Sequence, residues 1–358
     1  METLIETLPK IVIRPKISKS VWRNGYRMRK AIQYGFLAVS LLIGVQFYFW
    51  YRFYTAGGVE VSRPPGVEAF LPLSALISLK YWLTTGIFNK IHPAALVILL
   101  AVLAMSLIFK KSFCSFICPV GLISEWFWKL GRKVFGRSFI APFGWRPPNW
   151  LDYPLRSIKY LLLAFFVNAI LLSMDAPALG AFIDSPYNKI ADIKMLLFFI
   201  ELSGFALGVI LLLMVVSLFI SNFWCRYLCP YGALLGIVSF LSLVKIRRVK
   251  ETCTDCMACT RVCPAMIAVH KAGRVRSDEC TGCLECVKTC PVRDTLYPEV
   301  AFIKKKVTTR MYALIVLGVF ALFYAGARIT GNWSNNISKA EYRHHIENMG
   351  NFEYNHIR

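Results

Sequence analysis

The sequence predicts a polytopic, mostly α-helical membrane protein that is duplicated within the chain and carries one small α+β domain rich in cysteine. Three observations support this fold class. The 358 residues are 56% hydrophobic and 14% aromatic, and apolar runs near the length needed to cross a bilayer recur along them. One cysteine motif appears in both halves of the apolar part. Eight of the twelve cysteines lie between residues 253 and 290.

About five spans are expected. The first follows a leader rich in lysine and arginine and ends without a cleavage site, so we interpret it as an uncleaved helix rather than a signal peptide. The full-length apolar runs are residues 32–50, 94–109, 157–174, 202–221 and 312–327. Two further apolar stretches, 69–88 and 182–200, are interrupted by proline or charge, and we expect them to be re-entrant or interfacial segments.

The charge distribution predicts the orientation of these spans. The formal net charge is +22, from 42 Lys and Arg against 20 Asp and Glu. With two spans per repeat, residues 1–30, 110–159 and 222–310 share one side of the membrane and hold a net charge of +21. Basic loops stay in the cytoplasm, so we expect these segments to face the cytoplasm. This bias accounts for the positive charge, and no nucleic-acid partner is expected.

A cysteine motif follows a span in each half of the membrane part. The first is Cys114-x3-Cys118-Pro-x-Gly, and 111 positions later the second is Cys225-x3-Cys229-Pro-x-Gly. The loops ahead of these spans align at nearly the same offset, since both contain a Pro-x3-Ala-Phe pattern. Two sets of matches at one offset indicate an internal duplication of a membrane unit.

The cysteine-rich segment contains one pattern twice. Each copy reads Cys-x2-Cys-x2-Cys-x3-Cys-Pro, which is the bacterial ferredoxin run, and in two-cluster ferredoxins the fourth cysteine of each run ligates the other cluster. A zinc site or a disulfide knot rarely shows this repeated order. The predicted ligands are Cys253, Cys256, Cys259 and Cys290 for one [4Fe-4S] cluster, and Cys280, Cys283, Cys286 and Cys263 for the other.

The remaining four cysteines belong to the duplicated membrane motif. If they meet at the pseudo-twofold axis on the cytoplasmic edge, their thiolates could hold a further iron–sulfur or metal centre. Two alternatives stay open, namely buried inert thiols or one redox dithiol in each half. The repeated proline and glycine favour a shared centre. The candidate ligands are Cys114, Cys118, Cys225 and Cys229.

These motifs divide the chain into five parts. They are a basic cytoplasmic N-terminus (1–31), membrane repeat 1 ending in its cysteine motif (32–148), membrane repeat 2 ending in its cysteine motif (149–245), a 2[4Fe-4S] ferredoxin domain (246–310), and a final transmembrane helix with a tail (311–358). We expect the ferredoxin domain to be a small α+β fold of the bacterial type.

The chain resembles the membrane-bound polyferredoxin family, in which two Cys-x3-Cys-Pro motifs after membrane spans precede a double ferredoxin run. NapH, CcoG and the C-terminal half of NosR are members, and the segments at 63–70 and 78–82 look closest to NapH- and YccM-like members. The resemblance implies quinol-linked electron transfer to a respiratory or assembly partner. It also implies a multi-pass protein of the cytoplasmic (inner) membrane of a bacterium, with its ferredoxin domain facing the cytoplasm.

Candidate quinone ligands are the charged residues of the interrupted stretches, because ionisable groups within a membrane are costly and usually functional. Lys80 and Lys194 occupy equivalent places in the two repeats and could donate hydrogen bonds to the quinone oxygens. Glu68 or Glu201 could accept the protons that a quinol loses with its electrons. The alternative is that the lysines extend their ammonium groups to the membrane surface.

The functional hypothesis is an electron-transfer subunit with quinol dehydrogenase activity. It would pass electrons between menaquinone or ubiquinone in the membrane lipid and a redox partner in anaerobic respiration. That partner would be a ferredoxin-like protein, a cytochrome or a terminal reductase. The alternative hypothesis is a metallocentre-assembly or redox-regulatory protein, whose clusters reduce a metal or sense redox state.

Overall fold

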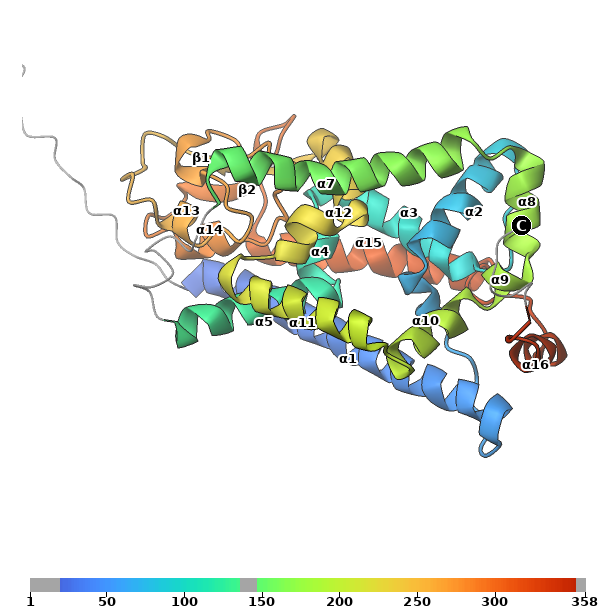
Figure 1. Ribbon diagram of the computed structural model, residues 1–358. Coiled ribbons are helices and arrows are strands. Elements are labelled where there is room, and N and C mark those ends of the chain that lie inside the picture. Colours follow the sequence, from blue (N-terminus) through green and yellow to red (C-terminus); the bar gives the residue numbers. More distant parts are fainter. Residues whose placement is uncertain (1–19, 136–146, 352–358) are drawn as a thin grey trace, which may run out of the picture.

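The computed structural model describes residues 20–135 and 147–351. It is an elongated bundle of helices with a small domain of strands and short helices at one end (Figure 1). We call the opposite end, where α8, α9 and α16 lie, the distal end (Figure 1). The predicted fold class, a helical membrane protein with an appended ferredoxin-type domain, is confirmed.

The first repeat consists of helices that mostly begin at proline, which suits the first helical position because its missing N–H would have no partner there. Its long first helix contains no proline and leads directly into the bundle. The elements are α1 (Ser20–Ala56), the 3-10 turn η1 (Pro65–Phe70), α2 (Pro72–Thr85), α3 (Pro93–Phe109), α4 (Ser112–Phe116) and α5 (Pro119–Val134).

The second repeat begins immediately after the Pro147-Pro148 break. Its distal helices are capped by side chains: Asp175 accepts from the Ala178 N–H at 2.9 Å, and Ser203 accepts from the Ala206 N–H at 3.2 Å. Such caps satisfy N–H groups that a helix leaves unpaired. The elements are α7 (Asn149–Val167), the π-helical turn η2 (Asn168–Leu172), α8 (Ala176–Asp184), α9 (Pro186–Lys189), α10 (Ala191–Ile200), α11 (Gly204–Phe219), the π-helical turn η3 (Trp224–Leu228), α12 (Pro230–Val238) and the 3-10 turn η4 (Ser239–Leu241).

The ferredoxin domain is built on an antiparallel sheet in the order β1-β2-β3. Val244 pairs with Val300 and Arg248 with Leu296, so the strand that enters the domain lies beside the strand that leaves it. The elements are β1 (Val244–Arg248), α13 (Ala258–Arg261), η5 (Val269–Lys271), α14 (Glu285–Thr289), β2 (Leu296–Val300), β3 (Lys305–Lys306), the last long helix α15 (Thr309–Ile329) and α16 (Lys339–Glu347) in the tail.

Three helical segments in the described part of the chain are long and apolar enough to cross a membrane: Gly25–Ala56, Trp150–Leu172 and Thr309–Ile329. Helices α10 and α11 form a fourth candidate if they count as one span, although they are bent by 82°. Helix α3 has 17 residues, at the lower end of the spanning range. The interrupted stretches 69–88 and 182–200 form short helices, and their predicted re-entrant or interfacial character stays a prediction.

Helix α3 is the centre of the bundle. Most of its side chains are buried, and α15, α2 and α12 pack around it. Its counterpart in the second repeat, α11, exposes most of its apolar side chains. Duplicated sequences therefore occupy different environments, and the first repeat supplies the core.

The helices that follow the two cysteine motifs cross over between the repeats. Helix α5, from the first repeat, packs on α11 of the second, and α12, from the second, packs on α3 of the first. Gly131 of α5 allows this approach, because a Cβ there would overlap the Leu218 backbone carbonyl. Reciprocal packing of this kind is expected of a duplicated unit.

Substitution of Gly131 tests the close approach. We expect Gly131→Ala to lower the thermal unfolding midpoint of detergent-solubilised protein, because overpacking of a tight contact costs about 1–3 kcal/mol. Gly208→Ala on α11 is the matched control, since a Cβ at Gly208 meets no atom within 4 Å. Equal midpoints for the two variants would contradict the crossed packing of α5 on α11.

Candidate functional site

The two ferredoxin runs adopt the same local conformation. Met257 and Leu284 each follow the second cysteine of a run and have left-handed backbone angles, with φ of 56° and 61°. Each then begins a short helix, α13 or α14, that carries the third cysteine of its run. The turn folds the first three cysteines of a run back on one another, as ligation of one cluster requires.

The fourth cysteine of each run lies beside the other run. Among the described thiols, Cys290 is electrostatically coupled to Cys259, Cys256 and Cys253. Cys263 is coupled in the same way to Cys283 and Cys280. Burial is the largest cause of the raised pKa of both thiols, and the neighbouring sulfurs raise it further.

The crossed pairing fits the donor set of two [4Fe-4S] clusters. A cavity in the ferredoxin domain is lined by Cys253, Cys256, Cys259 and Cys290. Within residues 20–135 and 147–351, no three His, Cys, Asp or Glu side chains already stand in metal-ligand geometry, those of the ferredoxin runs included. The fit therefore rests on the chemistry and the neighbourhood of the thiols.

The duplicated membrane motifs also share one geometry. Cys118 and Cys229 stand at the N-terminal caps of α5 and α12, each followed by a proline. The Gly232 N–H donates to the Cys229 Sγ at 3.3 Å. Gly121 lies against the Cys114 carbonyl, where a Cβ would overlap it. The Pro-x-Gly sequence thus aims backbone N–H groups at the sulfur of the second cysteine.

The four membrane-motif thiols lie together in the interior. Burial raises the pKa of Cys114 to about 12 and that of Cys118 to about 11, and nearby sulfurs from the other repeat raise both further. The Cys225 pKa is also raised, first by burial and then by Cys118 and the other two thiols. The neighbouring Lys111 ammonium opposes the shifts of Cys114 and Cys225. Four neighbouring, partly buried thiols suit a metal centre, which would keep them deprotonated.

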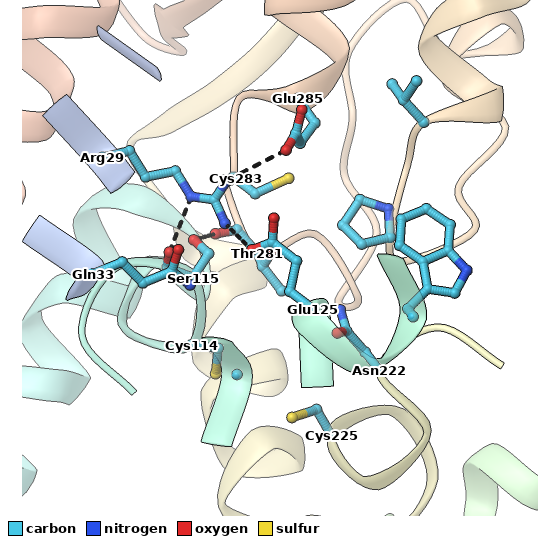
Figure 2. Close-up of a pocket in the computed structure, with 14 residues that line it drawn as sticks. Arg29, Gln33, Cys114, Ser115, Glu125, Asn222, Cys225, Thr281, Cys283 and Glu285 are labelled. Carbon is cyan, nitrogen blue, oxygen red and sulfur yellow. Dashed lines mark hydrogen bonds and ion pairs between the residues drawn. The ribbon is translucent and has the colours of Figure 1, made fainter. Parts of the chain in front are cut away.

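A pocket joins the membrane motifs to the ferredoxin domain. Cys114 and Cys225, one from each membrane motif, line it together with Cys283 of the second ferredoxin run (Figure 2). The loop that carries Cys283 rests on the end of the first repeat, since the Ser115 hydroxyl donates to the Thr281 carbonyl at 2.7 Å. In the first ferredoxin run, Cys256 is exposed. The cysteines therefore run from the membrane edge to the domain surface.

Buried ion pairs hold the domain in this position. Glu279, 4% exposed, pairs with Lys111 at 3.4 Å, with Arg156 at 3.2 Å and with the fully buried Lys159. Burial alone would raise the Glu279 pKa, but Lys111 and Lys159 lower it to about 2. Two segments of the membrane part, α7 and the turn before α4, thus converge on one carboxylate of the ferredoxin domain. Sequence reasoning missed this network, although Lys159 lies inside a predicted span and an ionisable group there is a signal.

A second ion-pair network connects the second repeat to the same domain. Arg226, next to Cys225, pairs with Asp152 at 2.8 Å and donates to the Ala265 carbonyl at 2.6 Å. The Tyr227 hydroxyl donates to Asp152 at 2.6 Å. The cysteine motif of the second repeat is therefore linked to the segment that follows Cys263.

The four candidate quinone residues lie toward the distal end, with different partners. Glu68 is buried, pairs with Arg63 at 3.0 Å and accepts from the Ala94 N–H at 2.9 Å, so it caps α3. Arg63 also binds Asp192 at 2.6 Å. His92 lies 3.6 Å from Glu68. Glu68 thus belongs to a buried charged cluster that sequence reasoning recognised only in part.

The other three candidates lie in different surroundings. The Lys80 ammonium donates to the Ile170 carbonyl at 3.0 Å and to the Met174 carbonyl, at the end of the α7–η2 helix. The Lys194 ammonium lies 4.8 Å from the Tyr187 ring centroid. Glu201 is exposed at the break between α10 and α11.

Comparisons with known proteins agree with this geometry. A family model described as a 4Fe-4S binding domain matches residues 91–138 and 202–248, once over each membrane motif. A 4Fe-4S dicluster domain model matches residues 245–291, over both ferredoxin runs. YccM of Escherichia coli (strain K12), whose name refers to electron transport, is 44% identical over 92% of each chain. The chain belongs to the membrane-bound polyferredoxin family.

More distant relatives share part of this polyferredoxin. The ferredoxin-type protein NapH of Haemophilus influenzae is 26% identical over 53% of this chain and 58% of its own. The regulatory protein NosR of Pseudomonas aeruginosa is 30% identical over 47% of this chain and 22% of its own. No solved structure matches. Iron–sulfur binding and a role in electron transfer therefore follow from the family and from the domains matched.

The Glu279 network generates a prediction for this polyferredoxin. Glu279→Gln leaves Lys111 and Lys159 buried without their shared anion, and breaking a buried pair costs about 3–5 kcal/mol. We expect faster proteolysis of the ferredoxin domain and a lower unfolding midpoint. Glu251→Gln, at an exposed position, is the control. Adding Lys159→Met to Glu279→Gln should restore part of the loss; no difference between Glu279→Gln and the control would refute the docking role.

Proposed function

We propose that this protein carries electrons between the membrane quinone pool and a redox partner through a row of iron–sulfur centres. The observation that supports this most is the pocket where Cys114, Cys225 and Cys283 meet. The pocket brings the membrane motifs together with the second ferredoxin run (residues 280–290), which we call the inner run. The first run (residues 253–263), which we call the outer run, contains the exposed Cys256. Such a row suits electrons that enter near the membrane and leave at the domain surface, or the reverse.

Two [4Fe-4S] clusters would occupy the ferredoxin domain, one on Cys253, Cys256, Cys259 and Cys290 and the other on Cys280, Cys283, Cys286 and Cys263. The dicluster match over residues 245–291 supports this number. A third centre would bind Cys114, Cys118, Cys225 and Cys229. The repeated 4Fe-4S match over the two membrane motifs and the burial of these thiols together support it.

The proposed location is the cytoplasmic membrane of a bacterium, with the ferredoxin domain on the cytoplasmic side. The basic-loop bias of residues 110–159 and 222–310 supports this orientation. The exposed outer run would then meet a cytoplasmic partner. The name of YccM refers to electron transport and NosR is named a regulatory protein, so electron transport and regulation both occur among the names of relatives. We favour delivery because the cysteine row reaches the surface.

The quinol would release protons at the distal end, where Glu68, Glu201, Lys80 and Lys194 lie. Helix α3 separates that end from the cysteines, and its 17 residues span about 26 Å at 1.5 Å per residue. Electron tunnelling slows exponentially with distance, so a quinol that reduces a centre at Cys114 would have to place its ring nearer to Cys114 than Glu68 lies. We therefore assign Glu68 and its cluster to proton transfer, with the electrons leaving the ring toward the membrane motifs.

The number of centres can be measured directly. Anaerobically purified protein should contain about eight irons from the two ferredoxin clusters, plus those of the third centre. Cys114→Ser with Cys225→Ser should lower the iron content and leave two cubane signals in EPR spectra. Ser74→Ala with Ser78→Ala, two buried polar positions in α2, controls for general damage. Unchanged iron and spectra in the cysteine variant would rule out the third centre.

The quinone residues can be tested through the rate of cluster reduction. Lys80→Met and Lys194→Met keep the apolar length of the side chain and remove its charge. If these lysines bind the quinol, reduction of the clusters by a quinol analogue should slow about tenfold or more, toward the 10²–10⁴ typical of lost acid–base groups. Lys90→Met, which removes a bond to the Gly331 carbonyl, is the control. Parental rates in both variants would place the quinone elsewhere.

A further inference from the structure

Arg29 lies outside every cysteine motif, yet its side chain reaches the pocket where the two membrane motifs meet the second ferredoxin run. It is 2% exposed, at the ferredoxin end of α1. Its Nε donates to the Ser115 carbonyl at 3.0 Å and its Nη2 to Glu125 at 2.9 Å. These two bonds fix the guanidinium in the pocket beside Cys283 (Figure 2).

Two N–H donors in this pocket have no hydrogen-bond partner. Among the buried side-chain atoms of the described residues, Arg29 Nη1 and Gln33 Nε2 both lack one. They come from neighbouring turns of α1, and both residues line the pocket with Cys114, Cys225 and Cys283. Unsatisfied buried donors are expensive, about 1–3 kcal/mol each, so their presence here indicates an acceptor that the protein binds. The cluster and thiolate sulfurs are the acceptors that the surrounding donor set implies.

The charge around the pocket is mixed but has a positive excess. Glu125 is shared by Arg29, by Lys30 at 2.9 Å and by Lys129 at 2.6 Å. Glu285 lies 3.7 Å from Arg29 Nη1, on the loop that also carries Cys283. Arg29, Glu285 and Cys283 line the same pocket, so a cation and a carboxylate both stand near this sulfur. Arg29 and Glu285 therefore act on this sulfur in opposite directions.

We propose that Arg29 and Gln33 form a redox-tuning site. Their N–H groups donate to the sulfurs at the pocket, and the guanidinium charge raises the reduction potential of the inner cluster, the one on Cys280, Cys283, Cys286 and Cys263. This rests on the proposed function. Reduction adds one electron and one negative charge to the cluster, and a fixed cation nearby stabilises the reduced form. Arginine keeps its proton throughout, so no proton accompanies the electron. Hydrogen bonds to sulfur act in the same direction.

Glu285 supplies the opposite influence at the same sulfur. Its carboxylate destabilises added negative charge, and its side chain is partly accessible, at 14% exposed. Removing the Glu285 charge should therefore raise the reduction potential of the inner cluster, whereas removing the Arg29 charge should lower it. Shifts of the reduction potential in opposite directions cannot result from general loosening of the domain, because loosening would shift the potentials of both variants in the same direction.

The test is an anaerobic redox titration of the full-length holoprotein, followed by EPR. Arg29→Gln should lower the reduction equilibrium constant of one [4Fe-4S] cluster at least tenfold, which corresponds to a fall of 59 mV in the midpoint potential of its EPR signal for a one-electron couple. Arg29→Lys, which keeps the charge, should shift it less. Glu285→Gln should raise it, and Gln33→Leu should lower it. Lys189→Gln, which removes a distal pair with Glu341 at 2.7 Å, should leave it unchanged.

The outcomes separate this proposal from the one on which it depends. Absence of any cluster signal in the parental protein would refute the proposed function itself. Clusters with parental potentials in both Arg29→Gln and Glu285→Gln would overturn the tuning site and leave the function intact. If Arg29→Gln does not assemble, Glu285→Gln decides alone, because its opposite shift is expected only when charge at the pocket sets the potential.

Discussion

Buried positive charge is the constraint on which the rest of this structure depends. Iron–sulfur clusters with four thiolate ligands are anions, and an uncompensated anion is costly where water is excluded. The inner ferredoxin run and the membrane motifs lie in such a region. Arg29, Lys111 and Arg226 reach them from three segments of the membrane part. Carboxylates of the ferredoxin domain and of α5 and α7 then hold these cations in place.

The duplication places the same cysteine motif and the helix that follows it in two different surroundings. After each cysteine motif the chain crosses to the other repeat, so α5 covers α11 and α12 covers α3. The crossing brings the four membrane thiols together at the junction of the repeats. Because the ferredoxin domain follows the second motif directly, it docks on the first: the Lys111 N–H donates to the Cys280 carbonyl at 3.3 Å. The core is also asymmetric, because α15 packs on α3 together with α2 and α12, whereas α11 stays largely exposed.

Local signals in the sequence predict the fold class and the places of the apolar helices and cysteine motifs, because spacing and hydropathy are properties of short segments. About five spans are expected from them, and the described residues contain three candidate spans, or four if α10 and α11 count as one. These signals could not show that α3 is enclosed by protein, since hydropathy does not distinguish a buried helix from one that faces lipid. Glu279 and its lysines come together only in the folded chain, and no sequence pattern around residue 279 predicts their contact. Glu68 is a candidate in the sequence as an intramembrane acid, but its bond to the start of α3 depends on the turn η1, which begins in the segment predicted as a loop before the stretch 69–88.

Helix α3 links the two ends of the molecule at which the proposed chemistry takes place. Its first turn is capped by Glu68, where a carboxylate also complements the helix dipole. Its last residue, Phe109, accepts a bond from the Tyr312 hydroxyl at 2.8 Å, beneath the loop that carries Cys283. Under the proposed function, protons leave a quinol at the first of these ends and electrons leave at the second. The opposite charges then move apart along the bundle, so quinol oxidation in this orientation would separate charge across the membrane.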